Sequence, residues 1–116
     1  MNVEFYWPKD HILGKMTQKQ TKNINDSVGK ELKNLGDLSI QTLENAKNTL
    51  VVDVLEISEK GALMDSRLFD STQMPISGKM TFWEVEKIAD FLSPKSLANH
   101  CSSLVQQLCE NAKMLK

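Results

Sequence analysis

Apolar side chains recur at helical spacing through the first half of the chain. Between residues 28 and 57 they are Val28, Leu32, Leu35, Leu43, Ala46, Leu50, Val54 and Ile57. Spacings of three and four residues put side chains on one face of an α-helix, whereas a half-buried strand alternates every two residues. Met64 and Leu68 continue this stripe in phase. The pattern therefore predicts a helix from about residue 22 to residue 69.

Two features of this region compete with a single helix. The stretch "NTLVVDVLEIS", residues 48–58, is rich in β-branched residues and would suit a strand on propensity alone. We favour a helix there because the stripe runs through it in phase, and propensity is the weaker signal. The pair Gly36-Asp37 could instead end one helix, with Asp37 or Ser39 starting a second.

The last third of the chain predicts two shorter helices. Thr81–Glu84 fits a capping box at the start of a helix over 82–92. Ser93 suits the N-cap and Pro94 the first position of a helix over 94–115. The apolar face of this last helix is a narrow stripe that consists of Leu97, Cys101, Leu104, Leu108, Ala112 and Leu115. So narrow a stripe is typical of a coiled-coil seam.

These elements define an all-α protein whose elongated amphipathic helices form a helical bundle or a coiled coil. Residues 1–20 are expected to be an irregular N-terminal segment, because "VEFYW" ends at Pro8 and no second strand is evident to pair with it. Residues 21–116 would form the helical domain. A narrow seam exposes apolar surface unless another chain covers it, so we expect a homo-oligomer.

Composition and charge exclude several classes of protein. The 116 residues are 41% hydrophobic and 25% charged, which suits a soluble globular or bundle-forming chain. The formal net charge of −1, with no basic block, makes nucleic acid an unlikely partner. No apolar run approaches the roughly 20 residues of a transmembrane segment. The N-terminus does not fit a secretory signal, so we expect a cytoplasmic protein.

The reactive side chains do not form a catalytic or metal-binding motif. Cys101 and Cys109 are eight residues apart on one expected helix, or roughly 12 Å, too far for a disulfide between them. We expect both to be reduced and packed as small apolar residues. The only histidines, His11 and His100, do not complete a zinc set. We therefore expect no cofactor, no metal and no enzymatic activity.

The stretch "ADFLSPKSLANHCSSLVQQLCENAKM", residues 89–114, resembles the signature of phasins, the helical proteins that coat bacterial polyhydroxyalkanoate granules. Phasins typically carry a Ser-Pro turn before a leucine-rich amphipathic helix, and a long helix like "NLGDLSIQTLENAKNTL" precedes it. This chain departs from phasins in its low alanine content and in His100, where a glutamine is expected. The resemblance implies a non-catalytic oligomer, in the cytoplasm or on a granule, whose amphipathic helices lie on the hydrophobic granule surface.

The expected interaction surface consists of Leu43, Leu50, Val54, Trp83, Leu97, Leu104, Leu108 and Leu115. Trp83 could also simply pack beneath the connector that precedes it. A small helical chaperone or adaptor, with its apolar stripe buried against one dedicated protein partner, would have the same composition. A helix-turn-helix DNA-binding protein is less favoured, because the first half of the last helix offers only Lys95 and His100 to phosphates.

Overall fold

The computed structural model describes residues 2–8, 17–35 and 38–111. In chain order its elements are β1 (Asn2–Tyr6), α1 (Gln18–Leu35), α2 (Leu38–Asn45), β2 (Thr49–Ile57), β3 (Gly61–Phe69), β4 (Pro75–Glu84), the short 3₁₀ helix η1 (Ile88–Leu92) and α3 (Pro94–Asn111).

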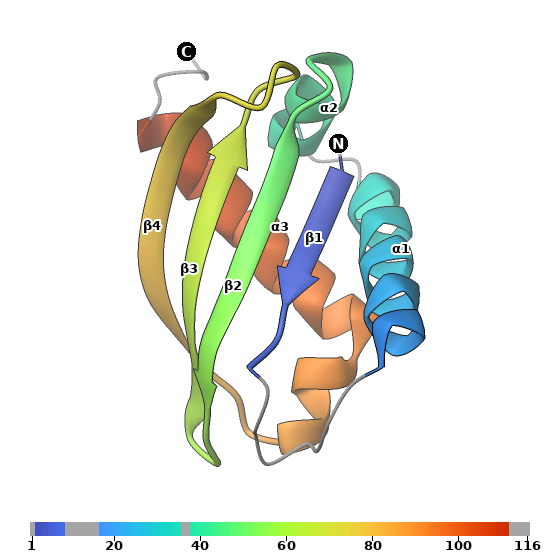
Figure 1. Ribbon diagram of the computed structural model, residues 1–116, viewed down its shortest axis with the longest axis vertical. Helices are drawn as coiled ribbons and strands as arrows, with labels where there is room; N and C mark the ends of the chain where they lie inside the picture. The colour runs from blue at the N-terminus through green and yellow to red at the C-terminus, as the bar shows by residue number, and fades with distance from the viewer. Residues whose placement is uncertain (1, 9–16, 36–37, 112–116) are drawn as a thin grey trace.

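The described strands form one mixed sheet in the order β1-β2-β3-β4. β1 lies parallel to β2, and β2, β3 and β4 follow one another as antiparallel neighbours. A parallel pair needs a long crossover connection, which here contains α1 and α2. α3 crosses one face of the sheet, while α1 lies beside β1 and packs on α3 (Figure 1). No described element covers the other face, so the sheet is open on one side.

The core lies between the sheet and the helices. Successive side chains of a strand point to opposite faces, so every second residue contributes to the core. On β2 the inward residues are Leu50, Val52 and Val54, and all three are buried. The other buried apolar side chains include Val3, Phe5, Val28, Leu32, Ile40, Leu43, Ile57, Ala62, Met64, Leu68, Phe91, Leu97, Leu104, Val105 and Leu108. The apolar stripes of α1 and α3 are thus covered within one chain.

The all-α prediction, with its helical bundle or coiled coil, is wrong. The helix expected over 22–69 ends at Leu35 and is followed only by the short helix α2. Residues 49–57 and 61–69 are strands β2 and β3. The β-branched content of residues 48–58, which the prediction set aside, was the better guide to this region.

An irregularity in β2 explains why its spacing resembles that of a helix. Leu50 and Val54 face the core and are four residues apart, a spacing that a strand and a helix share. The pairing with β3 then shifts between Val54 and Glu56, as at a β-bulge. The extra residue turns Ile57 back to the core face, only three positions after Val54. Spacings of four and then three are those of an amphipathic helix.

The helix expected over 82–92 is also largely wrong. Thr81–Glu84, taken as a capping box, lies within β4. Only the short 3₁₀ helix η1, Ile88–Leu92, is helical in this region. The T-x-x-E spacing has no capping role here, because the chain is extended and paired with β3.

The structure confirms the last helix. α3 begins at Pro94, and the backbone N–H of Ser96 donates to Ser93 Oγ at 3.4 Å, the geometry of a loose N-cap. α3 is described to Asn111, and the predicted end at residue 115 lies outside the described residues. Within these bounds the apolar stripe faces the core as the pattern requires.

The N-terminal segment, expected to be irregular, contains a strand. Asn2–Tyr6 forms β1 and pairs with β2 from Asn2↔Thr49 to Tyr6↔Asp53. The partner strand was missed because residues 49–57 were assigned to a helix. With β1 in the same sheet as β2, residues 2–6 share one core with the rest of the chain.

Neither cysteine of α3 forms a disulfide with a described residue and both are buried, as the sequence predicts. Burial disfavours the thiolate and raises the pKa of Cys101 to about 12. A thiol with so high a pKa is a poor nucleophile, so Cys101 acts as a small apolar residue in the core.

We expect Leu108→Ala to lower the free energy of unfolding by about 2–5 kcal/mol, because a fully buried leucine on α3 leaves a cavity when it is truncated. Leu35→Ala is the matched control, since Leu35 is 45% exposed at the end of α1 and should change stability by about 0.5 kcal/mol or less. Urea denaturation followed by circular dichroism measures both. Equal effects of the two substitutions would contradict this packing.

Candidate functional site

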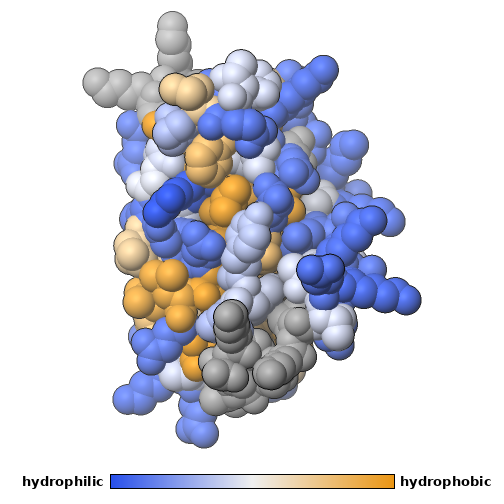
Figure 2. All heavy atoms as spheres, in the orientation of Figure 1, coloured by the Kyte–Doolittle hydropathy of each residue, from blue (hydrophilic) through white to orange (hydrophobic). Residues whose placement is uncertain are grey.

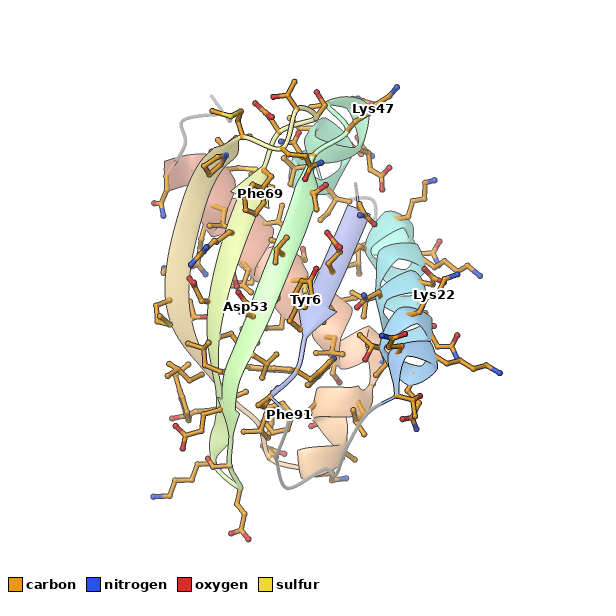
Figure 3. All side chains as sticks on the ribbon, in the orientation of Figure 1. Tyr6, Lys22, Lys47, Asp53, Phe69 and Phe91 are labelled. Atoms are coloured by element: carbon orange, nitrogen blue, oxygen red, sulfur yellow. The ribbon has the colours of Figure 1, made fainter. Side chains whose placement is uncertain are left out.

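The uncovered face of the sheet carries the most unusual surface of the described chain. The residues paired across its strands form three rows that point away from the helices. The rows are Tyr6–Asp53–Asp65–Met80, Glu4–Val51–Arg67–Gly78 and Glu56–Leu63–Phe82. We call these side chains the outer face. Tyr6, Asp53 and Phe69 are seen on this side in Figure 3.

Large apolar side chains on the outer face are left in solvent. Tyr6 is 52%, Met80 55% and Phe82 52% exposed. Leu55, at the bulge of β2, is exposed as well. In Figure 2 hydrophobic side chains gather at the lower left of this face and again near its centre, with hydrophilic ones between them. Several large apolar side chains exposed on one face are characteristic of interaction sites, whereas single exposed leucines are ordinary.

Carboxylates lie among these apolar residues. Asp53 and Asp65 are direct cross-strand partners on β2 and β3, and like charges in this position destabilise a sheet. Arg67 offsets one of them, with its Nη2 2.8 Å from Asp65 Oδ2. Asp53 makes no ion pair with a described residue. The three rows contain Glu4, Asp53, Glu56 and Asp65 against Arg67 alone, which gives four negative charges, one positive charge and a net charge of −3.

Tyr6 shows the effect of this charge. Its hydroxyl donates to Glu4 Oε1 at 3.3 Å. The negative charge of Glu4, partial burial and, more weakly, the charge of Asp53 raise the pKa of Tyr6 above its ordinary value. The phenol therefore stays protonated and remains a hydrogen-bond donor. The field at this end of the outer face favours a cation.

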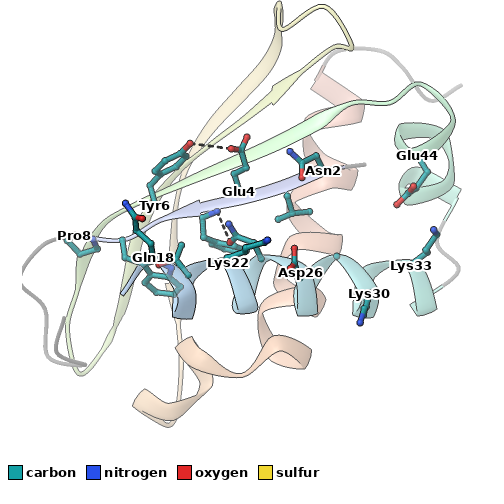
Figure 4. A pocket seen from close by; sticks show the side chains of 16 residues that line it. Asn2, Glu4, Tyr6, Pro8, Gln18, Lys22, Asp26, Lys30, Lys33 and Glu44 are labelled. Carbon is teal, nitrogen blue, oxygen red and sulfur yellow. Dashed lines mark hydrogen bonds between the residues drawn. The ribbon is translucent and has the colours of Figure 1, made fainter. Parts of the chain in front are cut away.

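A groove lies between the edge strand β1 and helix α1. This groove has a volume of about 1230 Å³ and is lined from β1 by Asn2 to Tyr6 and from α1 by residues including Lys22, Asn25 and Gly29 (Figure 4). It runs along the free edge of the sheet and adjoins Tyr6 at the border of the outer face.

Trp83 lies at the junction of β4, η1 and α3. Its ring meets Phe91 edge-on at a centroid distance of 5.3 Å and stacks on His100 at 4.5 Å with an interplanar angle of 7°. Trp83 is half-buried against the core. These contacts support the packing interpretation of Trp83, because its ring already stacks on His100 and contacts Phe91 within the chain.

The stacked His100 is kept neutral by its surroundings. Burial lowers the pKa of its imidazole to about 4, because the charged form loses its hydration. Its Nε2 is buried and has no hydrogen-bond partner among the described residues. This histidine therefore packs as an aromatic ring at neutral pH.

The structure brings most of the predicted interaction residues together in the core. Six of the eight are buried, with at most 5% exposure: Leu43, Leu50, Val54, Leu97, Leu104 and Leu108. Trp83 packs beside them, and Leu115 lies outside the described residues. In this fold the six buried side chains do not reach a partner. The outer-face residues were not predicted, although the alternation over 61–69 and the aromatic content of 75–84 could have indicated them.

Within the described ranges, no cluster of three or more His, Cys, Asp or Glu side chains could hold a metal ion. No helix described in the chain has the length and apolar character needed to cross a membrane. Comparisons with protein-family models, with curated proteins and with solved structures find no match to the chain.

We expect Asp53→Asn to raise the free energy of unfolding by about 0.2–1 kcal/mol, because it removes the repulsion between two directly opposed carboxylates. The gain should shrink in high salt and vanish in an Asp65→Asn background, where the repulsion is already gone. Thermal unfolding of the single and double variants measures it. A loss of stability in Asp53→Asn would contradict the repulsion.

His100 should make the fold sensitive to acid. The pKa is about 4 in the folded state and about 6.5 when the chain is unfolded, so the unfolded state binds the proton more tightly. The stability due to neutral His100 is complete above pH 6.5 and is lost as the pH falls toward 4. The loss is on the order of 2–3 kcal/mol.

The test of His100 compares the wild type with His100→Gln in urea at several pH values between 4 and 7. Carboxylates contribute the same slope to both proteins, so the difference reports His100 alone. The stability of the wild type should fall more steeply below pH 6.5. Parallel profiles would show that the buried imidazole takes up a proton without cost.

Proposed function

We propose that this protein is a non-catalytic binding module, of adaptor or chaperone type, that docks a protein partner on the outer face of the sheet. The observation that supports the proposal best is the row Tyr6–Asp53–Asp65–Met80, in which exposed apolar side chains flank two opposed carboxylates. Opposed carboxylates and exposed apolar side chains lower the stability of the free protein. Such a surface is expected where a bound partner covers the apolar side chains and pairs with the carboxylates.

The composition of the outer face indicates the chemistry of the partner. Met80, Phe82 and Leu63 offer an apolar area that is stabilised by burial at about 25 cal/mol per Å². Methionine adapts its shape to varied partners, and aromatic residues dominate the energetics of interfaces. The carboxylates of Asp53 and Asp65, in the middle of the sheet, can form charge-assisted hydrogen bonds with a lysine or arginine of the partner. A cationic and apolar protein surface fits this face best.

The granule-coating function that the resemblance to phasins implies is less favoured by this geometry. That function was assigned to the leucine stripe of the last helix, and Leu97, Leu104 and Leu108 are buried in the core. A carboxylate-bearing face would also lose hydration on a polyester surface without gaining a charged partner. The expected homo-oligomer stays a prediction, which sedimentation velocity tests directly.

We expect Met80→Glu to weaken partner binding by at least about tenfold, because it adds charge to the apolar part of the outer face. Met74→Glu is the matched control, since Met74 is 61% exposed just before β4 and outside the three rows. Proteins retained by the immobilised wild type are identified, and their dissociation constants are then measured with both variants. Equal affinity for the two variants would contradict the proposal.

Two further outcomes would change the nature of the partner. If sedimentation shows a dimer that Met80→Glu dissociates and Met74→Glu does not, the partner is a second copy of the chain. If the wild type binds polymer-coated beads and only Met80→Glu abolishes this, the outer face binds a hydrophobic particle and not a protein.

A further inference from the structure

The free edge of β4 is the most accessible edge of the described sheet. β4 is the longest described strand, with 10 residues, and none of them is buried. Among the described elements it packs mainly on β3 and, through its inner face, on α3. Lys79 reaches Gln107 from that inner face, so α3 lies beneath the strand and not beside it (Figure 1). The opposite edge of the sheet, at β1, has α1 packed beside it.

The pairing of the strands fixes which backbone groups of β4 face this edge. The N–H of Ser58 donates to the Gly61 carbonyl at 2.9 Å, so Gly61 directs its backbone groups toward β2. Backbone groups alternate along a strand, so Ala62 directs its groups toward β4, where it pairs with Trp83. By the same alternation, the β4 residues that direct their N–H and C=O groups to the free edge are Gly78, Met80, Phe82 and Glu84. β4 ends the sheet, so no described strand pairs with these groups.

The backbone features that protect an edge strand are confined to the beginning of β4. Pro75 lacks an N–H, and the register with β3 shifts between Leu68 and Phe69, opposite the first residues of β4. A proline and an irregular register both discourage pairing at an edge. From residue 78 to residue 84 the pairing with β3 is regular and the sequence contains no proline. A regular exposed edge of this kind is a template for an added strand.

The apolar side chains of residues 78–84 complement a second copy of the same segment. In an antiparallel pair centred on Thr81, Met80 of each copy lies opposite Phe82 of the other. Met80 is 55% and Phe82 52% exposed, so each of these side chains gains an apolar neighbour on the outer face. At the centre the two copies of Thr81 are paired, and threonines opposite each other are favourable in a sheet.

The charges of the segment also suit a second copy. Residues 78–84 carry one cation and one anion, Lys79 and Glu84, so their net charge is zero. In the pairing centred on residue 81, Lys79 lies opposite Trp83 and Glu84 lies opposite Gly78, so no like charges are opposed. The carboxylates of the three outer-face rows lie on β1, β2 and β3, and both β4 strands separate them from those of the second copy.

We propose that two copies of the chain pair through β4, antiparallel about a two-fold axis at Thr81. The backbone groups of Met80 in each copy bond to those of Phe82 in the other, and Gly78 and Glu84 extend the ladder at both ends. The two four-stranded sheets become one continuous sheet. An axis perpendicular to this sheet keeps both outer faces on the same side, so a single partner meets two of them. The pairing uses the edge of β4 and does not depend on the function proposed for the outer face.

Gly78→Pro tests the edge without changing an apolar side chain. Proline removes the outward N–H of residue 78, and its ring lies where the second strand would pair, so we expect the dissociation constant of the dimer to rise at least about tenfold. Gly78→Ala is the matched control, because it keeps the N–H and its Cβ would lie 3.6 Å from the nearest atom, an ordinary contact. Sedimentation velocity over a range of concentrations measures the dimer, and circular dichroism checks that each variant is folded.

The outcomes separate this pairing from binding on the outer face. Met80→Glu alters both surfaces, whereas Gly78→Pro keeps Met80 and Phe82 in place for an outer-face partner. A dimer that Gly78→Pro dissociates and Gly78→Ala preserves supports the edge pairing. A wild type that stays monomeric at every concentration overturns the pairing and leaves the outer-face proposal standing. A dimer that Gly78→Pro leaves intact but Met80→Glu dissociates is formed through the outer face and also overturns the pairing.

Cysteine crosslinking tests the register and does not depend on how Gly78→Pro folds. Met80→Cys is mixed with a size-tagged Phe82→Cys, and the mixture is treated with oxidised glutathione. Opposed residues of an antiparallel pair have Cα atoms about 5.5 Å apart, within the range of a disulfide, so the mixture should form a linked heterodimer.

Each single variant is the control for the mixture. In either variant alone the two introduced cysteines are displaced by two residues along the strand, which is too far for a disulfide. The wild type gives the background from Cys101 and Cys109, which are buried. Equal crosslinking of the mixture and of each variant alone would overturn the proposed pairing.

Discussion

The packing of α3 against the inner face of the sheet is the contact on which the rest of the structure depends. Leu97, Leu104 and Leu108 are almost fully removed from solvent beneath Leu50, Met64 and the other inward residues of the strands. Because the described helices all lie on the same side of the sheet, this packing leaves the opposite face uncovered by the described residues. The surface that we propose for binding is therefore a consequence of how the core is built.

In an open sheet, both the exposed face and the edge strands can associate with other chains unless side chains or neighbouring elements protect them. β4 starts at Pro75, which cannot donate to a further strand, and its Lys79 is hydrogen-bonded to Gln107 of α3. β1 has α1 packed beside it, and Asn25 of α1 accepts a hydrogen bond from the Phe5 N–H. The outer face keeps Asp53 and Asp65 opposed, and opposed charges resist burial against an arbitrary apolar surface. The outer face, which no described element covers, is a surface for which we propose a partner.

The outer face and the groove differ in charge. The three rows of the outer face carry a net charge of −3 among exposed apolar side chains, so the outer face suits the cationic and apolar side chains of a folded partner. The groove is lined by the three lysines Lys22, Lys30 and Lys33 and by the three carboxylates Glu4, Asp26 and Glu44, so its charges balance. Tyr6 borders both, because it is exposed on the outer face and also lines the groove.

The sequence by itself determined α1 and α3, since both carry uninterrupted apolar stripes, and α3 also has its Ser93-Pro94 start signal. Whether residues 49–57 form a strand or a helix depended on tertiary structure. The residues Leu50, Val54 and Ile57 fit a helix and a bulged strand equally well, and only pairing with β3 distinguishes the two. The candidate sites could not be predicted for the same reason. Asp53, Asp65 and Met80 lie far apart in the chain, and strand register alone aligns them.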